Sequence, residues 1–190
     1  MALTEPIRNP KDVYKFLNYF KKQGQTRNYV LATLGVYTAL RISDILSLNC
    51  NDVYNFATGK VRTSISITEK KTKKTKIIAL NKNVISALKA YAPLARPNAP
   101  LILNPKTAKA ISRIQAHRII RSAANAIGIN HNVSCHSLRK TFGYHSWKEG
   151  ISPIILMEIY NHSSYAITKR YLGVSQDDKN IAYLNMNFTK

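Results

Sequence analysis

The middle of the sequence changes its hydrophobic period, and this change limits the fold more than any other feature. From Val61 to Ile67, apolar and polar residues alternate as in a strand with one buried face. A second run over 76–80 reads as its partner, and a lysine-rich stretch, 69–75, lies between them. The two runs predict one antiparallel hairpin with a basic turn.

The rest of the chain has helical patterning. Asn9 followed by Pro10 is typical of a helix start, and Gly24 of its end. Ser43 is placed to begin a short helix, and the segment 101–103 is either a short strand or a buried connector. Further helices are predicted at about 26–39, 82–92, 107–127, 136–149, 153–160, 164–171 and 176–186. The fold class is therefore mainly α with a small antiparallel β-sheet (α+β).

The charge balance indicates a polyanionic partner. Lys and Arg number 29 against 9 Asp and Glu, a net charge of +20 over 190 residues. Nucleic acid is the first partner to expect and an anionic membrane surface the second. Two cysteines, no recognisable signal peptide and no run of 18 apolar residues favour a cytoplasmic protein with reduced thiols.

Motifs for nucleotide and metal chemistry are not evident. The sequence has neither a Gly-Lys-Ser/Thr phosphate loop nor a dinucleotide-binding glycine pattern. His131, Cys135 and His136 lie close in sequence, but no second cluster completes a tetrahedral metal site. The few carboxylates are scattered, which disfavours a two-metal nuclease. We therefore expect no cofactor and no metal.

Cleaving a phosphodiester without metal requires fixed cations, a proton donor and a nucleophile. Arg41 lies inside an apolar run and must meet an anion or carbonyl groups, with Asp44 three residues on to orient it. A buried structural Arg–Asp pair is the alternative. His136 and Arg139 share one helix face, after a capping Ser134, and can grip one phosphate. A solvated polar face explains them equally well.

Two further groups are candidates. The lysine-rich hairpin is rigid enough to insert into a groove, although a solvated turn or a localisation signal has the same composition. His162 is followed nine residues later by Tyr171, one of 11 tyrosines. A phenol, whose ordinary pKa is about 10, needs cationic neighbours to act as a nucleophile.

The ordered set of motifs resembles the tyrosine recombinases, the phage integrase family. It consists of Ala-Leu-Arg-Ile-Ser-Asp around Arg41, a hairpin lysine, His-Ser-Leu-Arg-Lys-Thr-Phe from His136, His-Ser-Ser from His162, and Tyr171. The resemblance runs from about Thr26 to the C-terminus and implies the catalytic core of DNA breaking-rejoining enzymes.

This resemblance implies a role for each site residue. Tyr171 would attack the scissile phosphate, giving a 3′-phosphotyrosyl link and a free 5′-hydroxyl, and resealing would need no ATP. Arg41 and Arg139 would bind the non-bridging oxygens, and His136 and His162 would assist proton transfer and hold the phosphate. Lys71 would protonate the leaving oxygen, with Lys73 and Lys74 as alternatives. The implied DNA contacts are Lys70, Lys73, Lys74, Lys76 and Lys140.

The resemblance also implies a domain organisation. Residues 1–190 would form one catalytic domain, with a core to about residue 175 and a C-terminal tail, 176–190. The N-terminal DNA-clamp domain of the family would be absent, as in an excised domain or in a short member resembling the fimbrial-switch inverting recombinases. Asn161 replaces a usual glycine and is expected to alter that turn, whereas Asp44 in place of glutamate is conservative.

The tail is expected to join copies of the chain. Apolar residues on its helix at about 176–186 would dock on a neighbouring protomer on DNA, with a monomer in the absence of DNA; they are Ile181, Tyr183, Leu184 and Met186. Site-specific recombination is the favoured function. A DNA-binding module of the same fold that does not cut, and a type IB topoisomerase-like relaxing enzyme, are the alternatives.

Overall fold

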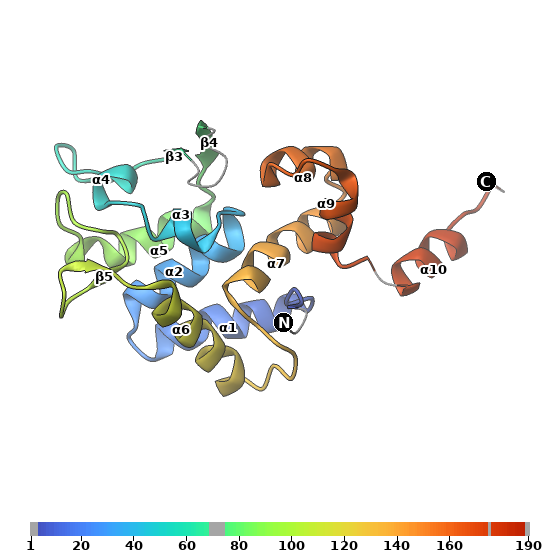
Figure 1. Ribbon diagram of the computed structural model, residues 1–190, viewed down its shortest axis with the longest axis horizontal. Helices are drawn as coiled ribbons and strands as arrows, with labels where there is room; N and C mark the ends of the chain where they lie inside the picture. Colours follow the sequence, from blue (N-terminus) through green and yellow to red (C-terminus); the bar gives the residue numbers. More distant parts are fainter. Residues whose placement is uncertain (1–3, 69–74, 175, 189–190) are drawn as a thin grey trace.

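The computed structural model describes residues 4–68, 75–174 and 176–188, which form a helical body carrying short hairpins (Figure 1). The predicted fold class is confirmed. The helices are α1 (Pro10–Lys22), α2 (Thr26–Tyr37), α3 (Ile42–Ile45), α4 (Cys50–Val53), α5 (Lys82–Tyr91), α6 (Arg113–Ala126), α7 (Cys135–Lys148), α8 (Pro153–Tyr160), α9 (Tyr165–Leu172) and α10 (Gln176–Leu184), with a 3-10 turn at Ala92–Leu94. The strands are β1 (Tyr54–Asn55), β2 (Lys60–Val61), β3 (Ser64–Thr68), β4 (Thr75–Ala79), β5 (Leu103–Asn104) and β6 (Lys109–Ala110).

Helix α2 lies at the centre of the core. Every residue from Tyr29 to Val36 is buried, and the helix packs against α1, α5 and α7. A helix that is apolar on all sides belongs in an interior. At Gly35, a Cβ atom would lie 2.7 Å from Leu138 Cδ1, so the absence of a side chain lets α7 approach α2 closely. This contact fixes α7 against the core.

Two predicted helix starts are wrong. The helix expected from residue 107 begins at Arg113, because Ser112 is extended and closes a capping box with Gln115, while Lys109–Ala110 pairs with β5. The helix expected after Ser43 begins at Ile42, because Arg41 holds the extended cap conformation. Arg41 is therefore the N-cap residue of α3.

The sequence predicted a single small sheet. The described part of the chain instead forms three two-stranded antiparallel sheets. The predicted hairpin is the pair β3–β4, in register from Ser64 opposite Ala79 to Thr68 opposite Thr75. The alternating run is interrupted after Val61, because the Arg62 amide donates to the Val53 carbonyl, 2.8 Å away. Buried Ile65 anchors the hairpin to the core.

Helix α10 extends away from the body beyond α9 (Figure 1). The side chains of Ile181, Tyr183 and Leu184 are 50%, 78% and 82% exposed. Lys148 on α7 donates to the Asp178 carboxylate and ties the first turn of α10 to the body. Within the described ranges, none of the helices has the length and apolarity needed to cross a membrane.

Candidate active site

The start of helix α7 carries two of the predicted site residues. The Ser134 hydroxyl accepts from the His136 amide at 3.2 Å, and the Ser137 hydroxyl accepts from the Ser134 amide at 3.0 Å. This capping box fixes His136 in the first turn and puts Arg139 one turn later. Arg139 is only 1% exposed, so its guanidinium must be neutralised or hydrogen-bonded inside the protein.

The two predicted arginines converge on one backbone oxygen. The Tyr160 carbonyl accepts from Arg139 Nη2 at 2.8 Å and from Arg41 Nη2 at 3.3 Å. Arg139 Nη1 donates to the Ala39 carbonyl. Ala39 has a φ of 54°, a strained left-handed conformation for a residue with a side chain. The two guanidinium groups thus lie close together, and guanidinium groups bind phosphate through bidentate hydrogen bonds.

Tyr160, which sequence reasoning missed, connects α7 to the end of α8. Its hydroxyl donates to the Arg139 carbonyl at 2.8 Å, and its ring lies 4.6 Å from the Arg139 guanidinium carbon. Burial raises the pKa of Tyr160 above its ordinary value, so the phenol stays protonated. The only signal in the sequence was its place directly before Asn161 and His162.

Tyr171 on α9 lies among the other site residues. Its ring meets the imidazole of His162 edge-on, with centroids 4.5 Å apart, and that of His136 at 4.8 Å. The Arg139 guanidinium carbon is 6.0 Å from the same ring centroid and Lys140 Nζ is 5.8 Å from it. The structure thus brings together the predicted phenol, both imidazoles and two cations.

His162 is held by the turn that follows α8. Asn161 adopts a left-handed conformation with a φ of 56°, which asparagine tolerates better than most residues with a side chain. The usual glycine is therefore not required for this turn. His162 Nδ1 hydrogen-bonds the buried Thr168 hydroxyl at 3.0 Å, and its ring stacks on Tyr160. Thr168, on α9, was not identified from the sequence.

His136 is a neutral imidazole at physiological pH. Burial, and then the positive charges of Lys140, Arg139 and Arg41, lower its pKa to about 4. A neutral imidazole next to a phenol accepts a proton, whereas an imidazolium does not. Burial and the surrounding cations therefore keep His136 free to accept a proton, although they also lower its strength as a base.

The remaining predicted site residues have different placements. Lys76 on β4 donates to the Ile159 carbonyl at 3.3 Å, next to the site. Asp44 is fully buried on α3, where its amide donates to the Arg41 carbonyl at 2.9 Å. Lys140 is 8% exposed, so it offers no open ammonium to a DNA phosphate. The predicted hairpin residues Lys70, Lys71, Lys73 and Lys74 lie outside the described residues.

Cys135, at the start of α7, carries a thiol with a shifted pKa. Burial raises the pKa of Cys135 to about 12, so its thiol is protonated. Across residues 4–68, 75–174 and 176–188, no three His, Cys, Asp or Glu side chains gather as metal ligands.

The sequence matches characterised families and proteins along most of its length. The phage integrase family profile matches residues 8–177. The probable integrase/recombinase YoeC of Bacillus subtilis is 38% identical over 183 residues, which are 96% of this chain and 97% of that protein. The TnP I resolvase of Bacillus thuringiensis is 31% identical over 170 residues, 87% of this chain but only 56% of the resolvase.

Solved structures share the fold. The crystal structure of XerA recombinase superposes with a TM-score of 0.79 at 19% identity, covering 98% of this chain and 68% of that one. The catalytic domain of bacteriophage HP1 integrase has a TM-score of 0.61 at 18% identity, covering 100% and 98%. With the family match over residues 8–177, the chain belongs to the phage integrase family and is a tyrosine recombinase, a DNA breaking and rejoining enzyme.

Proposed function

We propose that the chain recombines duplex DNA at specific sites through a covalent 3′-phosphotyrosyl intermediate on Tyr171. The observation that carries this proposal is the convergence of Arg41 and Arg139 on the Tyr160 carbonyl. The Tyr171 ring lies beside that arginine pair and against both imidazoles. A phosphate entering there would meet two guanidinium groups and the Tyr171 phenol.

In the proposed cleavage, the Tyr171 oxygen forms a bond to phosphorus and the bond from phosphorus to the 5′ oxygen breaks. The phenol proton passes to the neutral imidazole of His136, assisted by His162. The departing 5′ oxygen takes a proton from Lys71, with Lys73 and Lys74 as alternatives. Resealing runs these transfers in reverse, and because the phosphotyrosyl link conserves the free energy of the bond, neither ATP nor a metal ion is required.

The two arginines would act in sequence. Arg41 is partly exposed and is ready to contact a non-bridging oxygen, whereas Arg139 is 1% exposed. Arg139 therefore reaches a second oxygen only once the incoming phosphate displaces the Tyr160 carbonyl. Lys76 beside the site, together with Lys70, Lys73 and Lys74, would contact the DNA backbone. Asp44 would orient Arg41 from within α3.

Covalent trapping on a suicide substrate, nicked near the recombination site, tests the nucleophile. The wild-type protein should accumulate an adduct, and Tyr171→Phe should bind the same DNA without forming one. Tyr165→Phe is the matched control, because Tyr165 lies on the same helix and is 52% exposed. An adduct with Tyr171→Phe would show that another residue attacks. Binding without an adduct by the wild-type protein would favour the non-cleaving module.

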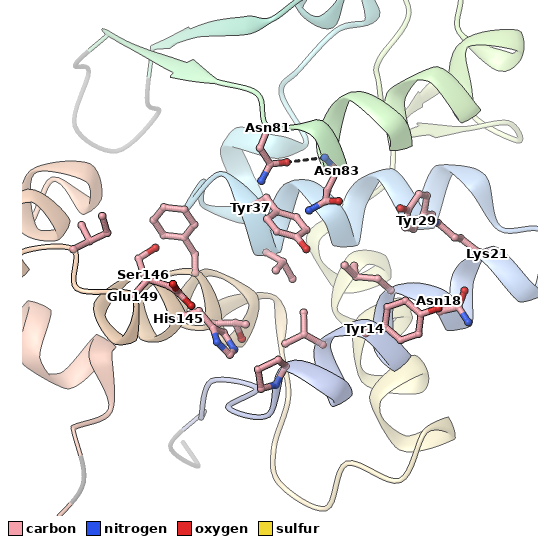
Figure 2. Close-up of a pocket in the computed structure, with 17 residues that line it drawn as sticks. Tyr14, Asn18, Lys21, Tyr29, Tyr37, Asn81, Asn83, His145, Ser146 and Glu149 are labelled. Carbon is pink, nitrogen blue, oxygen red and sulfur yellow. Dashed lines mark hydrogen bonds between the residues drawn. The ribbon is translucent and has the colours of Figure 1, made fainter. Parts of the chain in front are cut away.

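We also propose that copies of the chain assemble on DNA through α10. A groove of about 560 Å³ lies between α1, α2 and α7, with Val13, Leu17 and Phe142 among its apolar lining. Figure 2 shows Tyr14 and Tyr37 on its α1 and α2 sides and His145 and Glu149 on its α7 side. The apolar side chains of α10 would fill this groove on a second copy, because its own chain leaves them exposed.

Size measurement with and without a recombination site tests the assembly. The protein should be a monomer alone and a larger complex on DNA, and Leu184→Glu should reduce the complex to single bound copies. Asn185→Glu adds the same charge at a neighbouring exposed position and should leave assembly intact. A tail that folds onto its own groove would instead give monomers on DNA in every variant.

A further inference from the structure

A short N-terminal strap, Thr4–Arg8, is bound along helix α7. The Ile7 amide donates to the Thr141 hydroxyl at 2.9 Å, and His145 Nε2 donates to the Ile7 carbonyl at 2.9 Å. The Ile7 side chain is 1% exposed. The strap is thus held by hydrogen bonds from the amide and the carbonyl of Ile7, whose side chain packs in the core.

The strap also holds the ammonium of Lys140. Lys140 Nζ donates to the Thr4 carbonyl at 2.6 Å, and the same nitrogen lies 5.8 Å from the centroid of the Tyr171 ring. An ammonium that is 8% exposed is costly unless a polar group receives it. The Thr4 carbonyl meets this requirement and fixes the charge beside the nucleophile.

The same strap reaches the end of the helix that carries Tyr171. Gly173 ends α9 in a left-handed conformation with a φ of 61°. A Cβ atom there would lie 3.5 Å from Arg8 Nη2 and 3.6 Å from Pro6 Cγ. Arg8 also lies over the ring of Tyr144 on α7, 5.7 Å from its centroid. The strap therefore contacts both α7 and the C-terminal end of α9.

We propose that the strap and Lys140 form a positioning unit for strand cleavage, in which Thr4–Arg8 fixes the Lys140 charge beside Tyr171 and His136 and supports α9 against α7. Lys140 is a positioning residue that does not touch DNA, in contrast to the backbone contact that the sequence suggested. The proposal rests on the proposed role of Tyr171 as nucleophile.

The charge of Lys140 has a defined effect on its neighbour. The groups that face His136 are Arg41, before α3, Arg139 and Lys140 on α7, and Tyr171 on α9. After burial, Lys140 is the largest cause of the lowered pKa of His136. Loss of the ammonium would raise that pKa, so that the imidazole becomes protonated at a higher pH and the acid limb of the rate profile moves with it.

Lys140→Met in the full chain tests the unit by removing the charge at nearly constant side-chain length. For each unit by which the pKa of His136 rises from about 4, the single-turnover rate of adduct formation should fall by up to about tenfold on the acid limb, near and below pH 4, and should change little near pH 7. The acid limb of the rate profile should move to higher pH, with DNA affinity unchanged. Lys140→Arg keeps the positive charge and the hydrogen-bond donor, and should have the wild-type rate and the wild-type acid limb. Lys169→Met, at an exposed position on α9, should change neither.

Ile7→Ala tests the strap itself. It loosens the anchor without altering Lys140, and should shift the acid limb in the same direction as Lys140→Met. NMR titration of the His136 imidazole in wild-type protein and Lys140→Met gives a readout that needs no DNA. Because this titration is independent of cleavage, it separates failure of the strap unit from failure of the proposed nucleophile.

Two results would overturn the proposal. One is Lys140→Met with an unchanged rate profile and an unchanged pKa of His136. The other is Lys140→Met with weaker DNA binding and an unchanged single-turnover rate, which would make Lys140 a DNA contact. Should Lys140→Met fail to fold, an unshifted acid limb in Ile7→Ala would reject the unit and a shifted one would support it.

Discussion

Arg139 and Tyr160 bind each other twice. Arg139 Nη2 donates to the Tyr160 carbonyl at 2.8 Å, and the Tyr160 hydroxyl donates to the Arg139 carbonyl at 2.8 Å. These reciprocal bonds join the middle of α7 to the last residue of α8, two residues before His162. The position of an active-site imidazole therefore depends on the same contact that holds an active-site arginine.

Tyr160→Phe should lower the free energy of unfolding by about 1–2 kcal/mol, because a buried hydrogen bond is lost. Denaturant unfolding measures this effect. Tyr165→Phe, at an exposed position, should have no comparable effect. Equal free energies of unfolding for the two variants would mean that the hydrogen bond from the Tyr160 hydroxyl to Arg139 does not stabilise the contact between α7 and α8.

Gly143→Ala should destabilise the protein by about 1–3 kcal/mol through overpacking. The added Cβ would fall well inside contact distance of the Tyr160 hydroxyl. In a double-mutant cycle, Tyr160→Phe should recover part of the loss, since the clashing oxygen is gone. Strictly additive free energies of unfolding would argue against this contact as the cause.

Arg41→Ala and Arg139→Ala should each slow adduct formation by on the order of 10²-fold or more, as expected for loss of a preorganised charge at a transition state. Arg139→Ala should also be less stable than Arg41→Ala. Arg139→Ala leaves the Ala39 carbonyl without its guanidinium donor in the interior, whereas Arg41 is partly exposed. Single-turnover rates together with melting temperatures measure both effects, and rates close to wild type would remove the arginines from the mechanism.

Stability should fall as the pH is lowered from about 6.5 to about 4. The pKa of His136 is lowered to about 4 in the folded protein, while the unfolded chain retains the ordinary value near 6.5. In that window the unfolded state binds more protons, so the free energy of unfolding decreases with falling pH. The His136 contribution is on the order of 1–2 kcal/mol after allowance for solvent screening.

Urea unfolding of wild-type protein and His136→Gln across this pH range isolates that contribution from other groups. The difference between the two free energies of unfolding should shrink toward acid pH. A difference that stays constant would mean that His136 titrates normally.

DNA binding should weaken steeply with salt, because each neutralised phosphate contributes about −0.9 to the slope of log K against log salt concentration. A net charge of +20 leads us to expect many such contacts. Lys76→Gln should reduce the slope by about one such contribution. Fluorescence anisotropy over a salt series measures both, and a flat response would exclude a surface that follows the phosphate backbone.

The sequence predicted the starts of α1, α7 and α8 to within one residue. Asn9, Ser134 and Ser152 accept hydrogen bonds from amides of the first turns of α1, α7 and α8, and a cap of this kind acts locally. The helix expected from 107 begins later because Lys109 and Ala110 pair with the nearby strand β5. The capping box of Ser112 and Gln115 was readable and marked the true start.

The sequence singled out residues that lie together in the structure, but not the contacts that connect them. Motif order singled out Arg41, Arg139, His136, His162 and Tyr171, all of which the structure brings together. The carbonyl of Tyr160 and the strap around Ile7 could not be predicted, because backbone acceptors and contacts across 134 residues leave no local pattern. Lys140 comes directly after Arg139 in the sequence, and a DNA contact was predicted for it because lysines are rarely buried.

The connection between α9, which carries Tyr171, and α10 is short. Tyr171 is separated from α10 by residues 172–175 only, and Gly173 allows the chain to change direction there. If a second copy binds α10, as proposed, that contact lies only a few residues along the chain from Tyr171, the proposed nucleophile. Binding of α10 by another copy would then act on the position of Tyr171 through the chain itself, because both lie in one short stretch of sequence.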